Sequence, residues 1–241
     1  MELSQLYFNY ENIFIISYLF IISILSLFVS INVDKLYTFS KHFGIKIFKL
    51  AFLFFSVAFF SQGLIYLLNI WIIPTYFSNL SNLFILNLFI NGLELLFIYT
   101  IILSGFYIIY SLIWKRIHIA PNYLVNLKII IIHIIAISIA LISLFNQKIS
   151  FNLLFLSQII LFLYGIIICF DKYKNRKQTK KFTFIQLYFI ALIMMLVGWI
   201  FNYLDGFIRI IYPIFPLYTK FLTICIFCIF LYGVVKTTKN F

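Results

Sequence analysis

Long apolar stretches alternate with short polar breaks along the whole chain, and this alternation predicts its secondary structure. A helix needs about 20 apolar residues to cross roughly 30 Å of hydrocarbon. The sequence therefore predicts an all-α integral membrane protein, a seven-transmembrane-helix bundle that forms one domain over residues 1–241. The seven spans are expected at about residues 13–33, 48–71, 83–114, 125–145, 151–170, 182–204 and 213–235.

The third stretch, 83–114, is longer than a bilayer requires. A hydrophobic segment of that length either tilts strongly or projects into water at one end. The breaks between the stretches are too short to hold a folded soluble domain. Any activity must therefore come from the helices, from short loops or from a partner protein.

The basic residues follow the same alternation, because fifteen of the eighteen Lys and Arg fall into four clusters at alternate breaks. Basic residues in short loops stay on the cytoplasmic side of a membrane. The pattern thus predicts an N-terminus outside and a C-terminus in the cytoplasm. The four clusters are Lys35, Lys41, Lys46 and Lys49; Lys115, Arg116 and Lys128; Lys172, Lys174, Arg176, Lys177, Lys180 and Lys181; and Lys236 with Lys239.

Composition supports a membrane location. The chain is 65% hydrophobic and 10% charged, whereas a soluble domain carries about 25% charged residues. The net charge of +12 is interpreted as cytoplasmic loops held against anionic lipid head groups, not as a nucleic-acid surface. We expect a multi-pass protein of the cell membrane. The abundance of Phe and Ile leaves the mitochondrial inner membrane as an alternative.

Polar side chains inside the third span form one candidate site. Asn87, Asn91, Glu94 and Gly105 fall within a narrow sector of a helix. Glu94 lies 21 residues before the inner anchor Lys115, or about 31 Å along a helix, which places it near the outer boundary of the hydrocarbon.

Lys220 in the seventh span lies 16 residues, or about 24 Å, before Lys236, so it also falls in the outer half. Glu94 and Lys220 are therefore expected at the outer mouth of the bundle, with Asp205 and Arg209 nearby. Two interpretations stay open for this cluster. Either it binds an extracellular ligand or gates a path, or it forms an ion pair that orders the helices.

The remaining intramembrane polar groups are interpreted as structural. His133 is expected to be a hydrogen-bonded group, and Gln62, Gln158 and Gln186 are expected to make interhelical hydrogen bonds. Neither a metal nor a cofactor is expected. Cys169, Cys225 and Cys228 lack a nearby His or carboxylate, and Lys220 lies too near the outer surface for a retinal linkage. No enzymatic constellation is evident, so the chain is not expected to be an enzyme.

One segment suggests a relationship. Residues 36–55, LYTFSKHFGIKIFKLAFLFF, resemble the first cytoplasmic loop and second span of small, uncharacterised archaeal multi-span membrane proteins. The pattern is a Lys after Ser or Thr, then Gly44-Ile45, with Lys49 where Arg is commoner. The resemblance implies an archaeal cell membrane. Some of these proteins look similar to the seven-helix sensor portions of signalling proteins.

These features favour a non-enzymatic sensor or scaffold subunit. It would act on a cytoplasmic or membrane protein partner through the basic loop of Lys172, Lys174, Arg176, Lys177, Lys180 and Lys181. A first alternative is a small transporter or channel, with Asn87, Asn91, Glu94 and Lys220 along its path. A second alternative is an organelle-encoded subunit of a respiratory complex.

Overall fold

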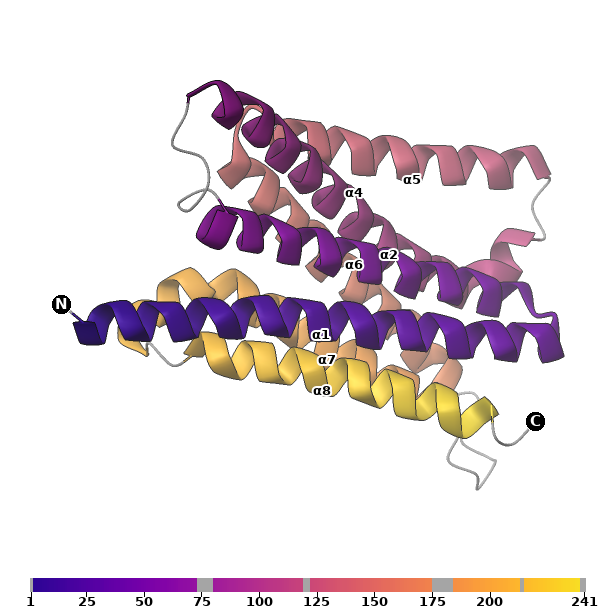
Figure 1. The fold of residues 1–241 in the computed structure, drawn as a ribbon. Helices are drawn as coiled ribbons and strands as arrows, with labels where there is room; N and C mark the ends of the chain where they lie inside the picture. The colour runs from indigo at the N-terminus through magenta and orange to yellow at the C-terminus, as the bar shows by residue number, and fades with distance from the viewer. Residues whose placement is uncertain (1, 73–79, 119–121, 175–183, 213–214, 239–241) are drawn as a thin grey trace.

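The apolar stretches all form helices. The computed structural model describes residues 2–72, 80–118, 122–174, 184–212 and 215–238, and within these ranges the regular structure is entirely helical (Figure 1). A π-helical turn, η1 (Leu68–Ile72), continues α2. The α-helices are α1 (Glu2–Ser40), α2 (Phe43–Leu67), α4 (Leu80–His118), α5 (Asn122–Ile142), α6 (Gln147–Lys174), α7 (Phe184–Ile211) and α8 (Phe215–Thr238).

Six of these helices are long and apolar enough, within the described ranges, to cross a membrane. They are α1, α2, α4, α6, α7 and α8, whereas the apolar part of α5, Leu127–Ile142, is shorter. The predicted class of an apolar helical bundle is therefore confirmed. The count of seven spans and their orientation remain predictions.

The six long helices form a closed ring. Each packs against its neighbours in the order α1, α2, α4, α6, α7 and α8, and α8 returns to α1. α5 stands outside the ring, where it packs against α4 and α6, and Figure 1 shows it well separated from α1 and α8. The exposed side of α5 is apolar, as a lipid-facing surface requires, with Ile130, Ile134 and Leu141 all about half exposed.

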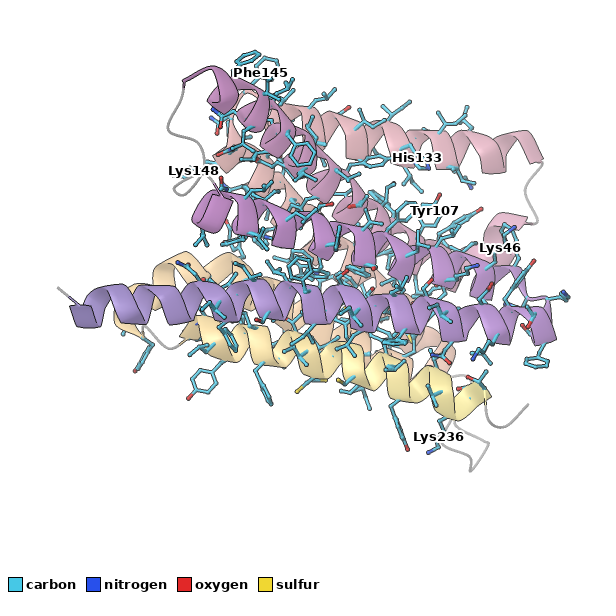
Figure 2. The ribbon with its side chains drawn as sticks, in the orientation of Figure 1. Lys46, Tyr107, His133, Phe145, Lys148 and Lys236 are labelled. Atoms are coloured by element: carbon cyan, nitrogen blue, oxygen red, sulfur yellow. The ribbon has the colours of Figure 1, made fainter. Side chains whose placement is uncertain are left out.

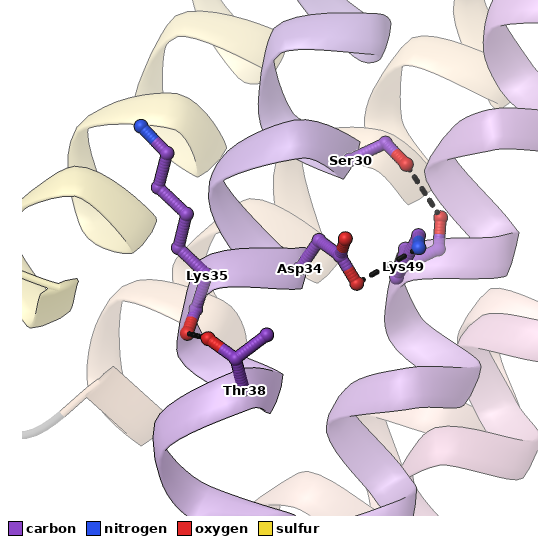
Figure 3. A network of polar contacts seen from close by, with 5 residues as sticks. All are labelled: Ser30, Asp34, Lys35, Thr38 and Lys49. Atoms are coloured by element: carbon purple, nitrogen blue, oxygen red, sulfur yellow. Dashed lines mark hydrogen bonds and ion pairs between the residues drawn. The ribbon is translucent and has the colours of Figure 1, made fainter.

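A row of serines joins α1 to α2. Ser23 Oγ donates to the Ser56 carbonyl over 2.9 Å, and Ser26 Oγ donates to the Phe52 carbonyl over 2.7 Å. One turn further on, Ser30 Oγ donates to the carbonyl of Lys49 (Figure 3). Small side chains allow two helix backbones to approach closely, and hydroxyl groups then add interhelical hydrogen bonds. We call this contact the serine seam.

The serine seam ends in an ion pair. Lys49 Nζ lies 2.8 Å from Asp34 Oδ1, one helical turn beyond Ser30 (Figure 3). Both side chains are partly exposed, so the pair is worth at most about 1 kcal/mol. It fixes the register of α1 against α2 at this end of the bundle.

A second close contact joins α4 to α6. Gly105 lies against the side-chain amide of Gln158, which is fully buried and donates from Nε2 to the Ile101 carbonyl over 3.1 Å. At the start of α6, Gln147 Nε2 donates to Glu94 Oε2 of α4 over 2.8 Å. The predicted interhelical role of Gln158 is confirmed. Glu94 and Gly105, which share a sector of α4, both contact α6.

Aromatic side chains of α2, α7 and α8 pack against one another inside the bundle. Phe48 and Phe52 of α2 contact Phe230 of α8, with ring centroids 6.1 and 5.0 Å apart. Tyr188 of α7 joins the same cluster, 5.2 Å from the ring of Phe48. Such tilted and edge-on pairs add about 0.5–1.5 kcal/mol each beyond the area they bury.

The two ends of the bundle differ in charge. The C-terminal ends of α1, α4, α6 and α8 lie together, and we call this the carboxyl-terminal end of the bundle (Figure 1). Lys46 and Lys236 lie there, while Lys148 lies at the opposite, amino-terminal end (Figure 2). Among the described residues, the first and the last basic clusters of the sequence thus each have a member at the carboxyl-terminal end.

We predict that Gly105→Ala destabilises the protein and that Gly92→Ala does not. A Cβ at Gly105 would overlap the buried amide of Gln158, whereas a Cβ at Gly92 would meet no atom within 4 Å. Overpacking of a tight contact costs about 1–3 kcal/mol. Thermal unfolding in detergent should therefore show a lower midpoint for Gly105→Ala alone. Equal midpoints for the two variants would contradict the α4–α6 contact.

Candidate functional site

A cavity of about 290 Å³ lies inside the helix ring. All six ring helices contribute to its wall, and α5 contributes none of the described lining residues. Cavities between the helices of a bundle are common ligand sites, and ligand pockets typically start at about 300 Å³. The cavity is therefore of a size that suits a small molecule.

The wall of the cavity changes from apolar to polar along the bundle axis. On α2 the lining residues run from Phe55 and Phe59 to Gln62 and Tyr66, which span 11 residues or about 16 Å toward the amino-terminal end. α7 runs in the same direction. Its lining residues pass from Met195 through Trp199 to polar groups.

Among the described lining residues, only Asp205 of α7 and Lys220 of α8 are charged. Asn202 and Asp205 follow Trp199 on α7, and Lys220 and Thr223 lie on α8. Because α8 runs in the opposite direction, Lys220 is nearer the amino-terminal end than Thr223. One carboxylate and one ammonium group thus belong to the same, polar part of the wall.

Aromatic rings close the apolar end of the cavity. The Phe227 ring meets Phe55 and Phe59 edge-on, with centroid distances of 5.6 and 5.8 Å. Trp199 packs edge-on against Phe155 of α6, with 5.6 Å between the ring centroids. This packing fixes the floor and one wall, so the apolar part of the cavity is preformed.

Two polar side chains of the wall donate hydrogen bonds to backbone carbonyls of their own helices. Asn202 Nδ2 donates to the carbonyl of Gly198 over 2.9 Å, and Thr223 Oγ1 donates to the carbonyl of Thr219 over 2.8 Å. The Asn202 bond leaves its side-chain oxygen as an acceptor, whereas the Thr223 hydroxyl also hydrogen-bonds the side chain of Tyr18 on α1.

The structure divides the predicted outer cluster between two places. Lys220 and Asp205 both line the cavity. Glu94 instead contacts α6 through Gln147, and Asn87 and Asn91 lie on the exposed surface of α4. Arg209 belongs to α7, but its side chain lies outside the described part of the chain.

His133 has two hydrogen-bond partners on α4. Its Nδ1 lies 2.8 Å from the Tyr99 hydroxyl, and its Nε2 lies 3.3 Å from the Tyr107 hydroxyl (Figure 2). The expected hydrogen-bonded role of His133 is confirmed, and it ties α5 to the ring. Across the described residues, no three His, Cys, Asp or Glu side chains come together in a way that would hold a metal ion.

The basic loop is only partly described. Lys172 and Lys174 belong to the last turn of α6, which therefore extends further than the predicted span. Arg176, Lys177, Lys180 and Lys181 lie outside the described residues.

Neither a protein family, nor a curated protein, nor a solved structure matches this chain. The chemistry of the cavity wall is what bears on function.

Sequence reasoning singled out Lys220 and Asp205 but missed most of the cavity. A usable signal was present, because the lining residues recur at spacings of three and four on each helix. Phe55, Phe59, Gln62 and Tyr66 on α2 give the clearest example, since polarity rises along the row. The serine seam left a similar signal in Ser23, Ser26 and Ser30, which sequence reasoning also missed.

We predict that a cysteine at Asn202 reacts with a small charged thiol reagent, because this position lines the polar part of the cavity. The matched control is Ala191→Cys on the same helix, where the native residue is fully buried and does not line the cavity. Both changes are made in a chain whose three native cysteines are replaced by Ala. We expect at least tenfold faster labelling at position 202. Equal rates would show that the cavity excludes water.

Proposed function

We propose that this protein is a seven-span membrane sensor that binds a small molecule in the ring cavity and signals to a cytoplasmic partner. The observation that carries the proposal is the wall of the cavity, which joins an aromatic floor to Asp205 and Lys220. Ligand sites combine mostly apolar walls with a few polar groups that fix orientation, and this cavity has that composition.

The proposed orientation places the N-terminus outside and the C-terminus in the cytoplasm. It is supported by the position of Lys46 and Lys236 at the carboxyl-terminal end of the bundle. In this orientation the polar side of the cavity faces the exterior. The bundle then presents a basic surface to anionic lipid head groups and to a protein partner on the cytoplasmic side.

A ligand in this cavity would touch several helices at once. A ligand shifts a conformational equilibrium only by the difference in its affinity for the two states. Since the wall includes α1, α2, α4, α6, α7 and α8, any rearrangement of the ring changes the ligand contacts. The same helices reach the carboxyl-terminal end, where α6 leads into the basic loop through which the partner would act.

The transporter and respiratory-subunit alternatives receive no comparable support. A transport path along Asn87, Asn91 and Glu94 would need these residues to share a wall with Lys220. Glu94 packs instead against Gln147, and the cavity wall includes none of the three. Solute flux through reconstituted vesicles would favour transport over sensing.

Orientation is tested by labelling single cysteines in intact cells with a membrane-impermeant thiol reagent. Phe145→Cys lies in the turn after α5 at the amino-terminal end, and Lys46→Cys lies at the opposite end (Figure 2). Both native side chains are exposed, Phe145 by 90%. We expect position 145 to react in intact cells and position 46 only after lysis. The reverse result would invert the proposed orientation.

Ligand binding is tested by a thermal-shift screen of purified protein against a panel of small polar, apolar and amphipathic molecules. A compound at 100 times its Kd stabilises the native state by about 2.7 kcal/mol. We expect at least one compound to stabilise the native chain and the control Gly92→Leu, but not Gly198→Leu. Gly198 lines the cavity, and a Cβ there meets only Ile226 at 3.5 Å, so a larger side chain fills the cavity. A panel in which no compound stabilises the native chain would overturn the proposal.

A further inference from the structure

The size of the cavity limits its occupant. An apolar cavity of about 150 Å³ holds one benzene molecule, with six non-hydrogen atoms. A cavity of about 290 Å³ therefore suits a molecule of roughly a dozen non-hydrogen atoms. A whole phospholipid is several times larger than this.

The charges on the wall indicate the polar end of that molecule. Asp205 and Lys220 line the same polar part of the cavity, one negative and one positive. Moving a charged group out of water is costly unless an opposite charge or hydrogen-bond partner meets it. A ligand with a single charge would meet one favourable and one unfavourable group. A zwitterion meets a partner for each of its charges.

The opposite end of the cavity indicates the rest of the molecule. Phe55, Phe59 and Phe227 form the floor, and Trp199 lies between the floor and the charged groups. Edge-on and offset contacts with these rings favour an aromatic or branched apolar group. Burial of such a group stabilises the complex by about 25 cal/mol for each Å² of apolar surface removed from water.

We propose that the cavity binds a small zwitterion with an apolar body, of the chemical class of an apolar or aromatic α-amino acid. Its carboxylate accepts hydrogen bonds from Lys220 Nζ, and its ammonium group donates to the carboxylate of Asp205. Its side chain points along the bundle axis toward Phe227. This inference rests on the proposed function, because it names the ligand class of the same cavity.

The experiment compares four probes of similar size on the purified full-length protein, by calorimetry or by competition with radiolabelled phenylalanine. The probes are L-phenylalanine, phenethylamine, 3-phenylpropionate and ethylbenzene. We expect phenylalanine to bind at least tenfold more tightly than each of the other three. Phenethylamine lacks the carboxylate for Lys220, 3-phenylpropionate lacks the ammonium for Asp205, and ethylbenzene lacks both.

Charge variants assign the two ends of the zwitterion. Lys220→Gln should weaken phenylalanine binding at least tenfold and abolish its advantage over phenethylamine. Asp205→Asn should likewise abolish its advantage over 3-phenylpropionate. Lys220→Arg and Asp205→Glu keep the charges and should retain part of the affinity. Lys148→Gln removes a basic residue from the same end of the bundle without touching the cavity, and should bind as the native chain does.

The outcomes separate this inference from the proposed function. If ethylbenzene or a singly charged probe binds as tightly as phenylalanine, the cavity holds a ligand but the zwitterion assignment is wrong. If none of the four probes binds while another compound in the thermal-shift screen does, the assignment is also wrong. If nothing binds in either experiment, both proposals fail. Should a charge variant fail to fold, the four probes on the native chain still decide the question.

Discussion

Close approach between helices is the constraint on which this fold depends. Within a bilayer, apolar side chains gain little by leaving lipid for one another, so helices associate through tight packing and interhelical hydrogen bonds. The serine seam supplies both for α1 and α2, because Ser23, Ser26 and Ser30 are buried and donate to backbone carbonyls. Gly105 and Gln158 do the same for α4 and α6. In each of these two contacts a small residue lets the neighbouring helix come close and a side chain donates to a backbone carbonyl across the interface.

The cavity follows from the distribution of side-chain size around the ring. Between α2 and α8 the interior is filled by large rings, with Phe52 against both Phe227 and Phe230. Beyond Phe227 toward the amino-terminal end, the facing positions include Gly198 and Thr223, which are too small to reach across. The space that remains is lined by the longer polar side chains of Gln62, Asp205 and Lys220. A gradient of size and polarity along one axis thus produces a site without any irregular backbone.

The sequence predicted the helices well and their arrangement poorly, for a physical reason. Apolar length and basic clusters locate spans, because lipid imposes both. Neither property distinguishes a lipid-facing surface from a packed one, since both are apolar in a membrane protein. Ser17 and Ser26 of α1 look alike in the sequence, yet Ser17 is exposed and Ser26 is buried in the seam. Polar groups in the apolar stretches were the informative positions. Gln158, Lys220 and Asp205 led to real features of the fold, whereas the partner of Glu94 depended on which helix came next to α4.

The two kinds of contact also indicate which helices of the proposed sensor can move. α1 and α2 are joined by directional bonds that run from Ser23 to the Asp34–Lys49 ion pair, so they should move as one unit. α8 meets α2 through aromatic rings, which can repack without losing a hydrogen bond, and it meets α1 through a hydrogen bond between Thr223 and Tyr18. Asp205 and Lys220 lie on α7 and α8, which take no part in the serine seam. A ligand held by these charges would therefore pull on α7 and α8 against a fixed α1–α2 pair. The displacement would reach the carboxyl-terminal end through α8 itself, which ends beside the basic residue Lys236.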